Sequence, residues 1–282
     1  MKTVSTIQEV REIVKKWRQE NCSIGFVPTM GYLHEGHESL MKAAKANHDK
    51  VVVSIFVNPM QFGKNEDLDT YPRDMEHDSA VCEAIGVDVI FHPSPSEMYG
   101  ENFYTYVDMD YLTEGLCGKS RPVMFRGVCT VVSKLFNIVQ PDKAYFGQKD
   151  AQQLAVITRM VKDLNFDLEI VGCPIVREED GLAKSSRNSY LNADERKAAL
   201  VLHHALTIAQ NLIESGETNA LLIKEKMIQE IKKEPLARID YVEIVDWENI
   251  KAIEQIHKSA LIALAVFIGK TRLIDNFIHI IK

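Results

Sequence analysis

The stretch Pro28-Thr29-Met30-Gly31-Tyr32-Leu33-His34-Glu35-Gly36-His37 decides how this chain folds. It follows a short apolar run at residues 24–27 and precedes an amphipathic stretch at residues 38–47. This pattern predicts a strand, a glycine-bearing turn and a helix, with both histidines where the helix begins. Unpaired N–H groups and the helix dipole favour anions at such a position. Two imidazoles three residues apart add directional donors, so we expect a phosphate-binding site here.

The composition of the 282-residue chain is ordinary for a globular protein, with 46% hydrophobic and 26% charged residues. Its net charge of −7 argues against a nonspecific nucleic-acid binder, whose surface would be basic. A local anion site remains compatible with this charge, because a pocket can be positive on an acidic protein.

The five cysteines are scattered and none forms a CxxC pair. We therefore expect neither a disulfide framework nor a zinc cluster, but reduced thiols. The first residues lack an apolar signal core, and the longest apolar run, residues 260–268, is too short to span a bilayer. The expectation is a soluble cytoplasmic protein that binds neither nucleic acid nor a membrane.

Helical and strand patterns alternate through the first half of the chain. We expect helices at residues 6–20, 36–47 and 75–85, and strands at residues 24–27, 51–57 and 87–91. This order is typical of an α/β fold with a Rossmann-like, doubly wound parallel sheet. Ligands bind at the carboxyl ends of such strands, where the histidine turn and a polar loop at residues 58–63 both lie.

The second half begins with an expected long irregular connection at residues 93–123. Beyond it we expect helices at 127–139 and 151–164, strands at 144–146 and 168–171, two helices around Gly216 within 194–233, and strands at 239–246 and 260–268. The composition shifts near residue 176, which predicts two domains. Residues 1–176 would form the Rossmann-like catalytic domain, and residues 177–282 a second, smaller α+β domain with the segment KSSR, residues 184–187, at its start.

The pair His34 and His37 has several possible meanings. Two histidines near a helix start are often only surface or structural residues. A metalloprotease HExxH motif needs a four-residue spacing, whereas these two are three apart with Gly36 between them. A zinc site needs further ligands, which no clustered cysteine or histidine supplies. A phosphate site needs only the strand, turn and helix, and a neighbouring polyphosphate favours the charged, donating imidazole.

Other polar segments fit the same chemistry. KSSR is either a solvated loop or a mobile loop that clamps a triphosphate, with lysine as a point charge and arginine as a fork. Lys149 follows a strand and is either merely exposed or a third cation at the ligand edge. The neutral amides of Asn58, Gln61 and Gln153 suit hydroxyls and a carboxylate, although each is also compatible with an ordinary polar role.

Together these segments resemble the pantothenate synthetases (pantoate–β-alanine ligases) over essentially the whole chain. The resemblance rests on PTMGYLHEGH at 28–37, VNPMQFG at 57–63, YPRD at 71–74, FRGV at 125–128, YFGQKDAQQL at 145–154, VREEDGLAKSSRNSYL at 176–191 and TRLIDN at 271–276. HEGH is also similar to the HIGH element of the wider nucleotidyltransferase superfamily, with KSSR in the place of its KMSKS-like loop.

The resemblance implies an ATP-dependent ligase that forms a C–N bond in two half-reactions. The carboxylate of pantoate attacks the α-phosphate of ATP, which gives pantoyl adenylate and pyrophosphate. The amine of β-alanine then attacks the acyl carbon and releases AMP and pantothenate. Positioning and charge stabilisation would supply most of the catalysis.

The resemblance also implies a set of site residues. ATP would contact Met30, Gly31, Tyr32, Leu33, His34, Glu35, Gly36, His37, Gly147, Gln148, Lys149, Asp150, Val176, Lys184, Ser185, Ser186 and Arg187. The catalytic residues would be His37, as general acid, with His34, Lys149, Ser185, Ser186 and Arg187. Gln61 and Gln153 would bind pantoate, and Gln61 would also face β-alanine. Mg²⁺ is expected on the phosphates without an assigned protein ligand, Asp78 being the nearest acidic candidate, and a homodimer is implied.

Two departures and two alternatives accompany the resemblance. Val123-Met124 stand where many members have Gly-His, and Cys117 where an acidic residue is common. One alternative is another nucleotidyltransferase that acts on a phosphorylated small molecule. The neutral amides Gln61 and Gln153 argue against it, because a phosphorylated acceptor would require more cationic side chains. The other is a nucleotide-binding regulator without catalysis.

Overall fold

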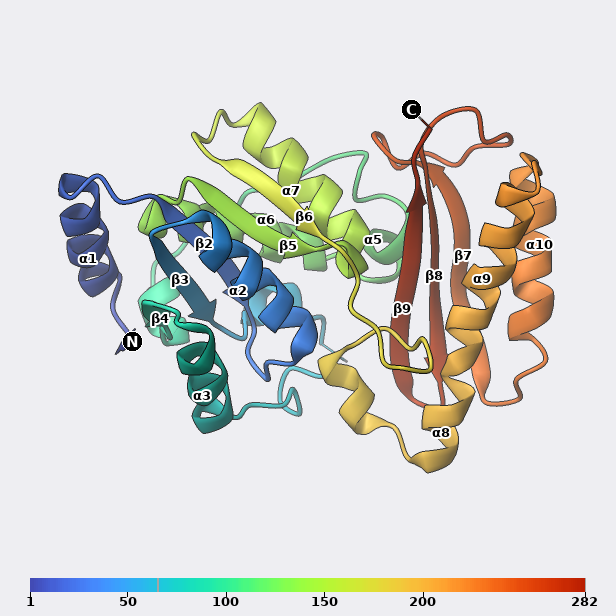
Figure 1. Ribbon diagram of the computed structural model, residues 1–282, viewed down its shortest axis with the longest axis horizontal. Helices are drawn as coiled ribbons and strands as arrows, with labels where there is room; N and C mark the ends of the chain where they lie inside the picture. The colour runs from blue at the N-terminus through green and yellow to red at the C-terminus, as the bar shows by residue number, and fades with distance from the viewer. Residues whose placement is uncertain (65, 282) are drawn as a thin grey trace. The chain divides into compact units, whose positions relative to one another are not determined.

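The computed structural model describes residues 1–64 and 66–281 and divides into two compact units (Figure 1). The first unit comprises Met1–Met109, Arg121–Gln148 and Val156–Pro174. The second comprises Asp110–Ser120, Lys149–Ala155 and the chain from Ile175 onward. Across the described residues, no helix is both long and apolar enough to cross a membrane.

Six parallel strands form the sheet of the first unit. They are β1 (Lys2–Val4), β2 (Ile24–Thr29), β3 (Lys50–Ile55), β4 (Val89–Phe91), β5 (Lys143–Gly147) and β6 (Glu169–Cys173). Their order is β1-β4-β3-β2-β5-β6, so β3 and β4 lie on one side of β2 and β5 and β6 on the other. This confirms the predicted doubly wound α/β fold. It also makes the carboxyl ends of β2 and β5 the topological switch point, where such folds bind ligands.

Helices cover both faces of this sheet (Figure 1). They are α1 (Ile7–Gln19), α2 (Glu35–Asn47), α3 (Met75–Ile85), α4 (Pro95–Met98), α6 (Met124–Val139) and α7 (Ala151–Asp163), whose first residues belong to the second unit. On one face, α2 and α3 share a buried cluster with Val27 and Tyr145. On the other, Phe136 of α6 meets Phe26 and Phe146 edge-on at ring-centroid distances of 6.4 Å. Because side chains alternate along a strand, both faces demand apolar residues, which explains the continuous apolar runs.

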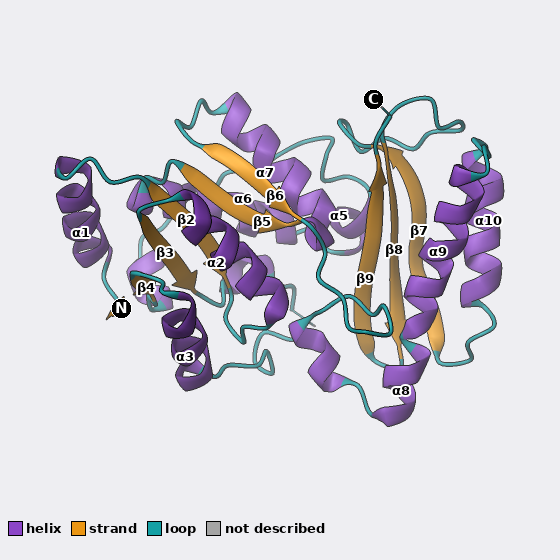
Figure 2. Ribbon diagram, viewed as in Figure 1, coloured by secondary structure: helices purple, strands orange, loops and turns teal. Residues whose placement is uncertain are grey.

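A three-stranded antiparallel sheet lies at the centre of the second unit (Figure 2). Its strands are β7 (Ala237–Asp246), β8 (Ala260–Ile268) and β9 (Thr271–His279), and its helices are α5 (Leu116–Ser120), α8 (Ala193–Ala198), α9 (Leu200–Glu214) and α10 (Ala220–Ile231). β8 is the central strand, and Ile262, Leu264 and Val266 are buried in a cluster with α9 and α10. This confirms the predicted smaller α+β unit.

Several element predictions need correction. Residues 93–123 are not irregular throughout, because they contain the short helices α4 and α5. Residues 193–231 hold three helices rather than two, since Ala199 separates α8 from α9 while keeping helical dihedrals, so the periodicity runs on. The predicted break at Gly216 is confirmed, with φ +95° between α9 and α10. β1 and β9 were not predicted; in β9 the adjacent polar residues Asp275 and Asn276 interrupt the alternation.

Candidate active site

The turn after β2 has a backbone that only glycine accepts easily. Gly31 has φ +84°, and a Cβ there would lie 2.8 Å from Asp78 Oδ2 and 2.9 Å from Ile55 Cγ2. Thr29 Oγ1 donates to the carbonyl of Ser54 at 2.8 Å and accepts from the N–H of Gly31 at 3.2 Å. The turn is therefore held close to the carboxyl ends of β2 and β3.

Asp78, on α3, binds the main chain of the same turn. Its Oδ2 accepts from the N–H of Tyr32 at 2.8 Å and its Oδ1 from the N–H of Leu33 at 2.7 Å. The neighbouring His77 Nε2 lies 3.1 Å from the carbonyl oxygen of Leu33. Burial raises the pKa of Asp78, and the two main-chain hydrogen bonds oppose that rise. Both carboxylate oxygens are engaged by the main chain, a role that no local sequence signal indicated.

His34 and His37 cap the N-terminus of α2 with their own side chains. The N–H of Gly36 donates to His34 Nδ1 at 3.1 Å, and the N–H of His34 donates to His37 Nδ1 at 3.3 Å. The two ring centroids lie 4.1 Å apart. This is a capping box built from histidines, in which each Nδ1 must be an acceptor. In the neutral rings the proton is therefore on Nε2, so each ring presents Nε2–H as its donor.

Gln61 lies beside the histidine turn, whereas Asn58 is committed to structure. Gln61 Nε2 donates to Met30 Sδ at 3.1 Å, and its Oε1 accepts from Asn58 Nδ2 at 3.0 Å. Asn58 is 1% exposed and also bonds the carbonyl of Gly127 and the hydroxyl of Tyr99. Of the two roles considered for Asn58, the structure shows the ordinary polar one: its amide bonds neighbouring groups and orients Gln61.

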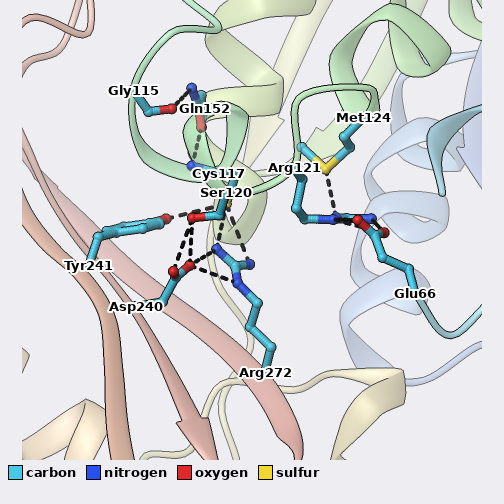
Figure 3. A network of polar contacts seen from close by, with 10 residues as sticks. All are labelled: Glu66, Gly115, Cys117, Ser120, Arg121, Met124, Gln152, Asp240, Tyr241 and Arg272. Atoms are coloured by element: carbon cyan, nitrogen blue, oxygen red, sulfur yellow. Dashed lines mark hydrogen bonds and ion pairs between the residues drawn. The ribbon is translucent and has the colours of Figure 1, made fainter. Parts of the chain in front are cut away.

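An ion pair follows the loop that carries Gln61 (Figure 3). Arg121 pairs with Glu66 through both carboxylate oxygens, and its Nη2 also donates to the carbonyl of Gln61 at 3.3 Å. The side chains of Arg121 and Glu66 are 16% and 23% exposed, so the pair is only partly screened by solvent. Arg121 thereby fixes the main chain of Gln61.

In the second unit, Lys149 is fixed through its main chain. Asn276 Nδ2 on β9 donates to the carbonyl of Lys149 at 2.8 Å. The ammonium group of Lys149 lies 4.0 Å from a carboxylate oxygen of Asp150, its sequence neighbour. Lys149 belongs to the 3₁₀ turn η2 (Gln148–Asp150), which directly follows Gly147 at the end of β5.

Residues 176–184 form a tight hairpin rather than an unstructured loop. The N–H of Glu178 donates to the carbonyl of Leu182 at 2.8 Å, and that of Lys184 to the carbonyl of Val176 at 2.9 Å. Gly181 has φ +96° at the tip. Two ion pairs support it, Arg177 with Asp275 at 2.7 Å and Lys184 with Glu178 at 2.8 Å.

The rest of KSSR begins a short 3₁₀ helix, η3 (Ser186–Tyr190). Ser185 is its N-cap, and Ser185 Oγ accepts from the N–H of Arg187 at 3.3 Å. Ser186 is 8% exposed. A hydroxyl that accepts a hydrogen bond can still donate its own proton, so capping by Ser185 remains compatible with donation to a phosphate.

Gln152, next to Gln153 in the first turn of α7, is a buried residue that sequence reasoning missed. Its Nε2 donates to the carbonyls of Leu112 and Gly115, each at 2.9 Å, and its Oε1 accepts from the N–H of Cys117 at 2.9 Å. This amide is 5% exposed and joins residues 112–117 to the start of α7, from which Gln153 also projects.

A second network ties α5 to the sheet of the second unit (Figure 3). Asp240 is an extra residue at a β-bulge, since the β7–β8 register shifts between Ile239 and Tyr241. It accepts from Arg272 at 2.7 Å and from Ser120 Oγ at 2.9 Å. Cys117 Sγ lies 3.3 Å from the hydroxyl of Tyr241 and 3.6 Å from Arg272 Nη2. The departure at Cys117 thus gives a thiol that packs against this arginine.

The comparisons with known proteins agree with this architecture. A family model described as pantoate-beta-alanine ligase matches residues 2–278. A pantothenate synthetase of Clostridium botulinum (strain Langeland) is 61% identical over 277 residues, which are 98% of this chain and 99% of the relative. One from Ruminiclostridium cellulolyticum is 60% identical over 279 residues, 98% of each chain.

Two solved structures are similar over nearly the whole chain. The pantothenate synthetase of Thermus thermophilus is 45% identical, with a TM-score of 0.94 and coverage of 98% of this chain and 99% of that one. The pantoate-beta-alanine ligase of Francisella tularensis, complexed with beta-gamma ATP and beta-alanine, is 34% identical, with a TM-score of 0.80 and coverage of 98% and 97%.

Proposed function

Because the chain belongs to the pantoate-beta-alanine ligase family, we propose that it condenses pantoate with β-alanine at the expense of ATP. Pantoate attacks the α-phosphate of ATP to give pantoyl adenylate and pyrophosphate. The amine of β-alanine then displaces AMP, which gives pantothenate. The product places the enzyme in the biosynthesis of coenzyme A.

The histidine capping box is the observation that carries this proposal. Both imidazoles accept main-chain hydrogen bonds at Nδ1 and so present Nε2–H as donors, beside the N-terminus of α2 and at the switch point of the sheet. Donors of fixed direction at a helix N-terminus suit a polyphosphate whose charge grows in the transition state. The Francisella relative bound to an ATP derivative and β-alanine supports the same ligands.

The proposed roles divide by unit. In the first, Met30 to His37 contact ATP, with His37 donating a hydrogen bond from Nε2–H to the pyrophosphate leaving group and His34 donating beside it. Gly147 and Gln148 adjoin the nucleotide, and Gln61, held by Asn58 and Arg121, binds pantoate and faces β-alanine. In the second unit, Lys149, Lys184 and Arg187 supply positive charge to the phosphates, with Ser185 and Ser186 as neutral donors. Asp150 and Val176 adjoin the nucleotide, and Gln153 binds pantoate.

Mg²⁺ is proposed to bind to the triphosphate rather than to a protein cage. Asp78 does not fit as its ligand, since it is 1% exposed and both of its carboxylate oxygens point at main-chain N–H groups of the turn. Mg²⁺ keeps several waters and binds phosphate oxygens readily, so few protein ligands are needed. When bound, the ion would neutralise charge on the transferred phosphoryl group.

A homodimer in the cytoplasm is the remaining part of the proposal. Tyr104 and Tyr106 of the first unit are 80% and 51% exposed, and aromatic residues are enriched at interfaces. All five cysteines are free, as suits a reducing compartment. Sedimentation of the wild type and of a Tyr104→Ser variant would test this contact; a monomeric wild type would contradict it.

The function is tested by AMP release. Purified protein with ATP and Mg²⁺ should release AMP only when pantoate and β-alanine are both present, and pyrophosphate with pantoate alone. Turnover with a phosphorylated acceptor in place of pantoate would instead identify another nucleotidyltransferase. ATP binding without pyrophosphate release under any of these conditions would identify a regulator.

A further inference from the structure

Two adjacent buried residues of β9 hold two separate cationic segments of the second unit. Asp275 is 2% exposed and Asn276 is 3% exposed. Asn276 Nδ2 donates to the carbonyl of Lys149 at 2.8 Å. Asp275 accepts from Arg177 in a bidentate pair, at 2.7 Å from Nη1 and 2.9 Å from Nη2.

The two contacts lie on opposite faces of the sheet, because side chains alternate along a strand. Leu273, two residues before Asp275, is buried among α9 and α10, so Asp275 points to the face that these helices cover. Asn276 points to the other face, as Arg272 does, where α5 and Lys149 are bound. A single strand therefore fixes both segments relative to one rigid sheet.

Through Arg177, Asp275 also stabilises the tip of the hairpin. Arg177 Nη1 also donates to the carbonyl of Gly181 at 3.0 Å. Arg177 and Ala183 face each other across the hairpin, and Lys184 follows directly. Fixing Arg177 thus fixes the backbone from which the Lys184 side chain extends.

We propose that Asp275 and Asn276 are positioning residues for ATP, each acting through a different lysine. Asn276 sets the place of Lys149 through its carbonyl, and Asp275 sets the place of Lys184 through Arg177. The inference rests on the proposed function in that it takes these lysines as ligands of the triphosphate. Neither β9 residue contacts the nucleotide itself.

The experiment measures ATP affinity by titration in the absence of pantoate, and pyrophosphate release in a single turnover with pantoate. Asn276→Ala removes the donor and leaves a cavity, whereas Asn276→Leu removes the donor at similar volume. Both should weaken ATP binding by about three- to tenfold, the usual worth of one hydrogen bond. Asp275→Asn should have an effect of similar size, because a neutral amide cannot match the bidentate guanidinium.

The decisive readout is non-additivity with each lysine. In a Lys149→Ala background the Asn276 variants should cause no further loss of ATP affinity, while Asp275→Asn still does. In a Lys184→Ala background the pattern should reverse. Residues that act through a shared partner fail to add, whereas independent sites add. Full additivity in every combination would overturn the proposal, as would wild-type ATP affinity in the Asn276 variants or failure of both to fold.

Asp240→Asn is the matched control. It breaks another partly buried acid–arginine pair on the same sheet, with Asp240 and Arg272 19% and 18% exposed, but one that holds α5 instead of either lysine. Its effect on ATP affinity should add to that of both lysine variants. A wild type that binds ATP without pantoate-dependent pyrophosphate release would refute the proposed function. The ATP titrations of the variants would still test the positioning roles of Asp275 and Asn276. A wild type that binds no ATP would refute both.

Discussion

The histidine turn of the first unit and the hairpin of the second are stabilised by different kinds of interaction. The turn at residues 29–37 is held by main-chain hydrogen bonds to Thr29, to the histidine rings and to one buried carboxylate, Asp78. The hairpin at residues 176–184 adds two pairs of opposite charges, Arg177 with Asp275 and Lys184 with Glu178, to its own main-chain hydrogen bonds.

This difference indicates how each segment could contribute to binding a polyphosphate. The hydrogen bonds that hold the turn come from the chain itself and give its donors a fixed direction, which is the preorganisation that catalysis needs. Lys184 of the hairpin is paired with Glu178, so in the proposed role a phosphate would compete with a carboxylate for it. The turn is therefore suited to the chemical step and the hairpin to the strength of binding.

The largest expected effect sharpens the role of the turn. His37→Asn keeps an acceptor near Nδ1 for the His34 N–H but removes the Nε2 donor. It should slow adenylate formation by about 10²–10³, the usual cost of one well-placed donor, with little change in melting temperature. His37→Gln places its amide near Nε2 and loses the cap, so it should retain more activity and less stability. Single-turnover pyrophosphate release and thermal unfolding check both; equal rates in the two variants would contradict the assignment.

Asp78→Asn should show whether the turn depends on that carboxylate. The amide can accept only one of the two main-chain N–H groups, so one buried donor is left unsatisfied at a cost of about 1–3 kcal/mol. Both the free energy of unfolding and ATP affinity should fall. Asp74→Ala is the control: it removes the N-cap of α3, which accepts from His77 at 2.9 Å, and should lower stability by about 1 kcal/mol without changing ATP affinity. Equal losses of ATP affinity in both would contradict the prediction.

Asp78 also predicts a pH dependence of the turn. Burial raises its folded-state pKa above the ordinary value of 3.8, so on acidification the folded protein takes up this proton before the unfolded chain does. Protonation converts one acceptor oxygen into a donor and releases a main-chain N–H of the turn. ATP affinity should therefore decline as pH falls through the raised pKa, and this dependence should be absent in Asp78→Asn.

The turn was predictable from sequence because its signals are local. Gly31 between a strand and a helix, and two histidines spaced for a helix start, lie within ten consecutive residues. The support from Asp78 was not predictable, since Asp78 and Leu33 are 45 residues apart in the chain. Asn58 and Gln61 look alike as amides in the sequence, and only the contacts of Asn58 with Gly127 and Tyr99 distinguish this buried residue from the partly exposed Gln61.

The polar composition around KSSR predicted a loop, either solvated or mobile, and did not reveal the hairpin at residues 176–184. Part of its support comes from Asp275, which is 98 residues from Arg177 in the sequence, and composition alone cannot indicate such a partner. In the same way, residues 110–120 and 149–155 group with the second unit through Gln152, Asp240 and Arg272, whose partners are far apart in sequence. The strand alternation that would have revealed β9 is masked by the same buried Asp275 and Asn276.

A smaller effect tests whether the hairpin competes for its own lysine. Glu178→Gln removes the carboxylate 2.8 Å from the Lys184 ammonium. A partly exposed pair of this kind is worth up to about 1 kcal/mol, so ATP affinity should increase about two- to fivefold. Asp180→Asn is the control on the same hairpin, because its partner is Arg196 and not Lys184. Weaker ATP binding in Glu178→Gln would show that the pair positions Lys184 instead of competing for it.

The smallest effect concerns the ring beneath the hairpin tip. A Cβ on Gly181 would lie 2.1 Å from His203 Cδ2, so the turn sits directly on this imidazole, whose Nδ1 is buried without a hydrogen-bond partner. Burial, followed by the charge of Arg177, lowers the folded-state pKa of His203 below 6.5, while Asp275 and Asp180 oppose the shift and His204 adds to it. Between that lowered pKa and 6.5 the unfolded chain binds more protons, so the stability that His203 contributes rises with pH and is lost on acidification.

His203→Gln should therefore flatten the pH dependence of the free energy of unfolding just below pH 6.5, by less than one proton per molecule. His204→Gln, at the exposed neighbouring position, should leave the slope in place. Some slope remains in either variant, because burial also lowers the pKa of His48 in the first unit. Denaturant titrations at closely spaced pH values measure this slope. An unchanged slope in His203→Gln would mean that the hairpin tip does not shield the ring and so does not lower the pKa of His203.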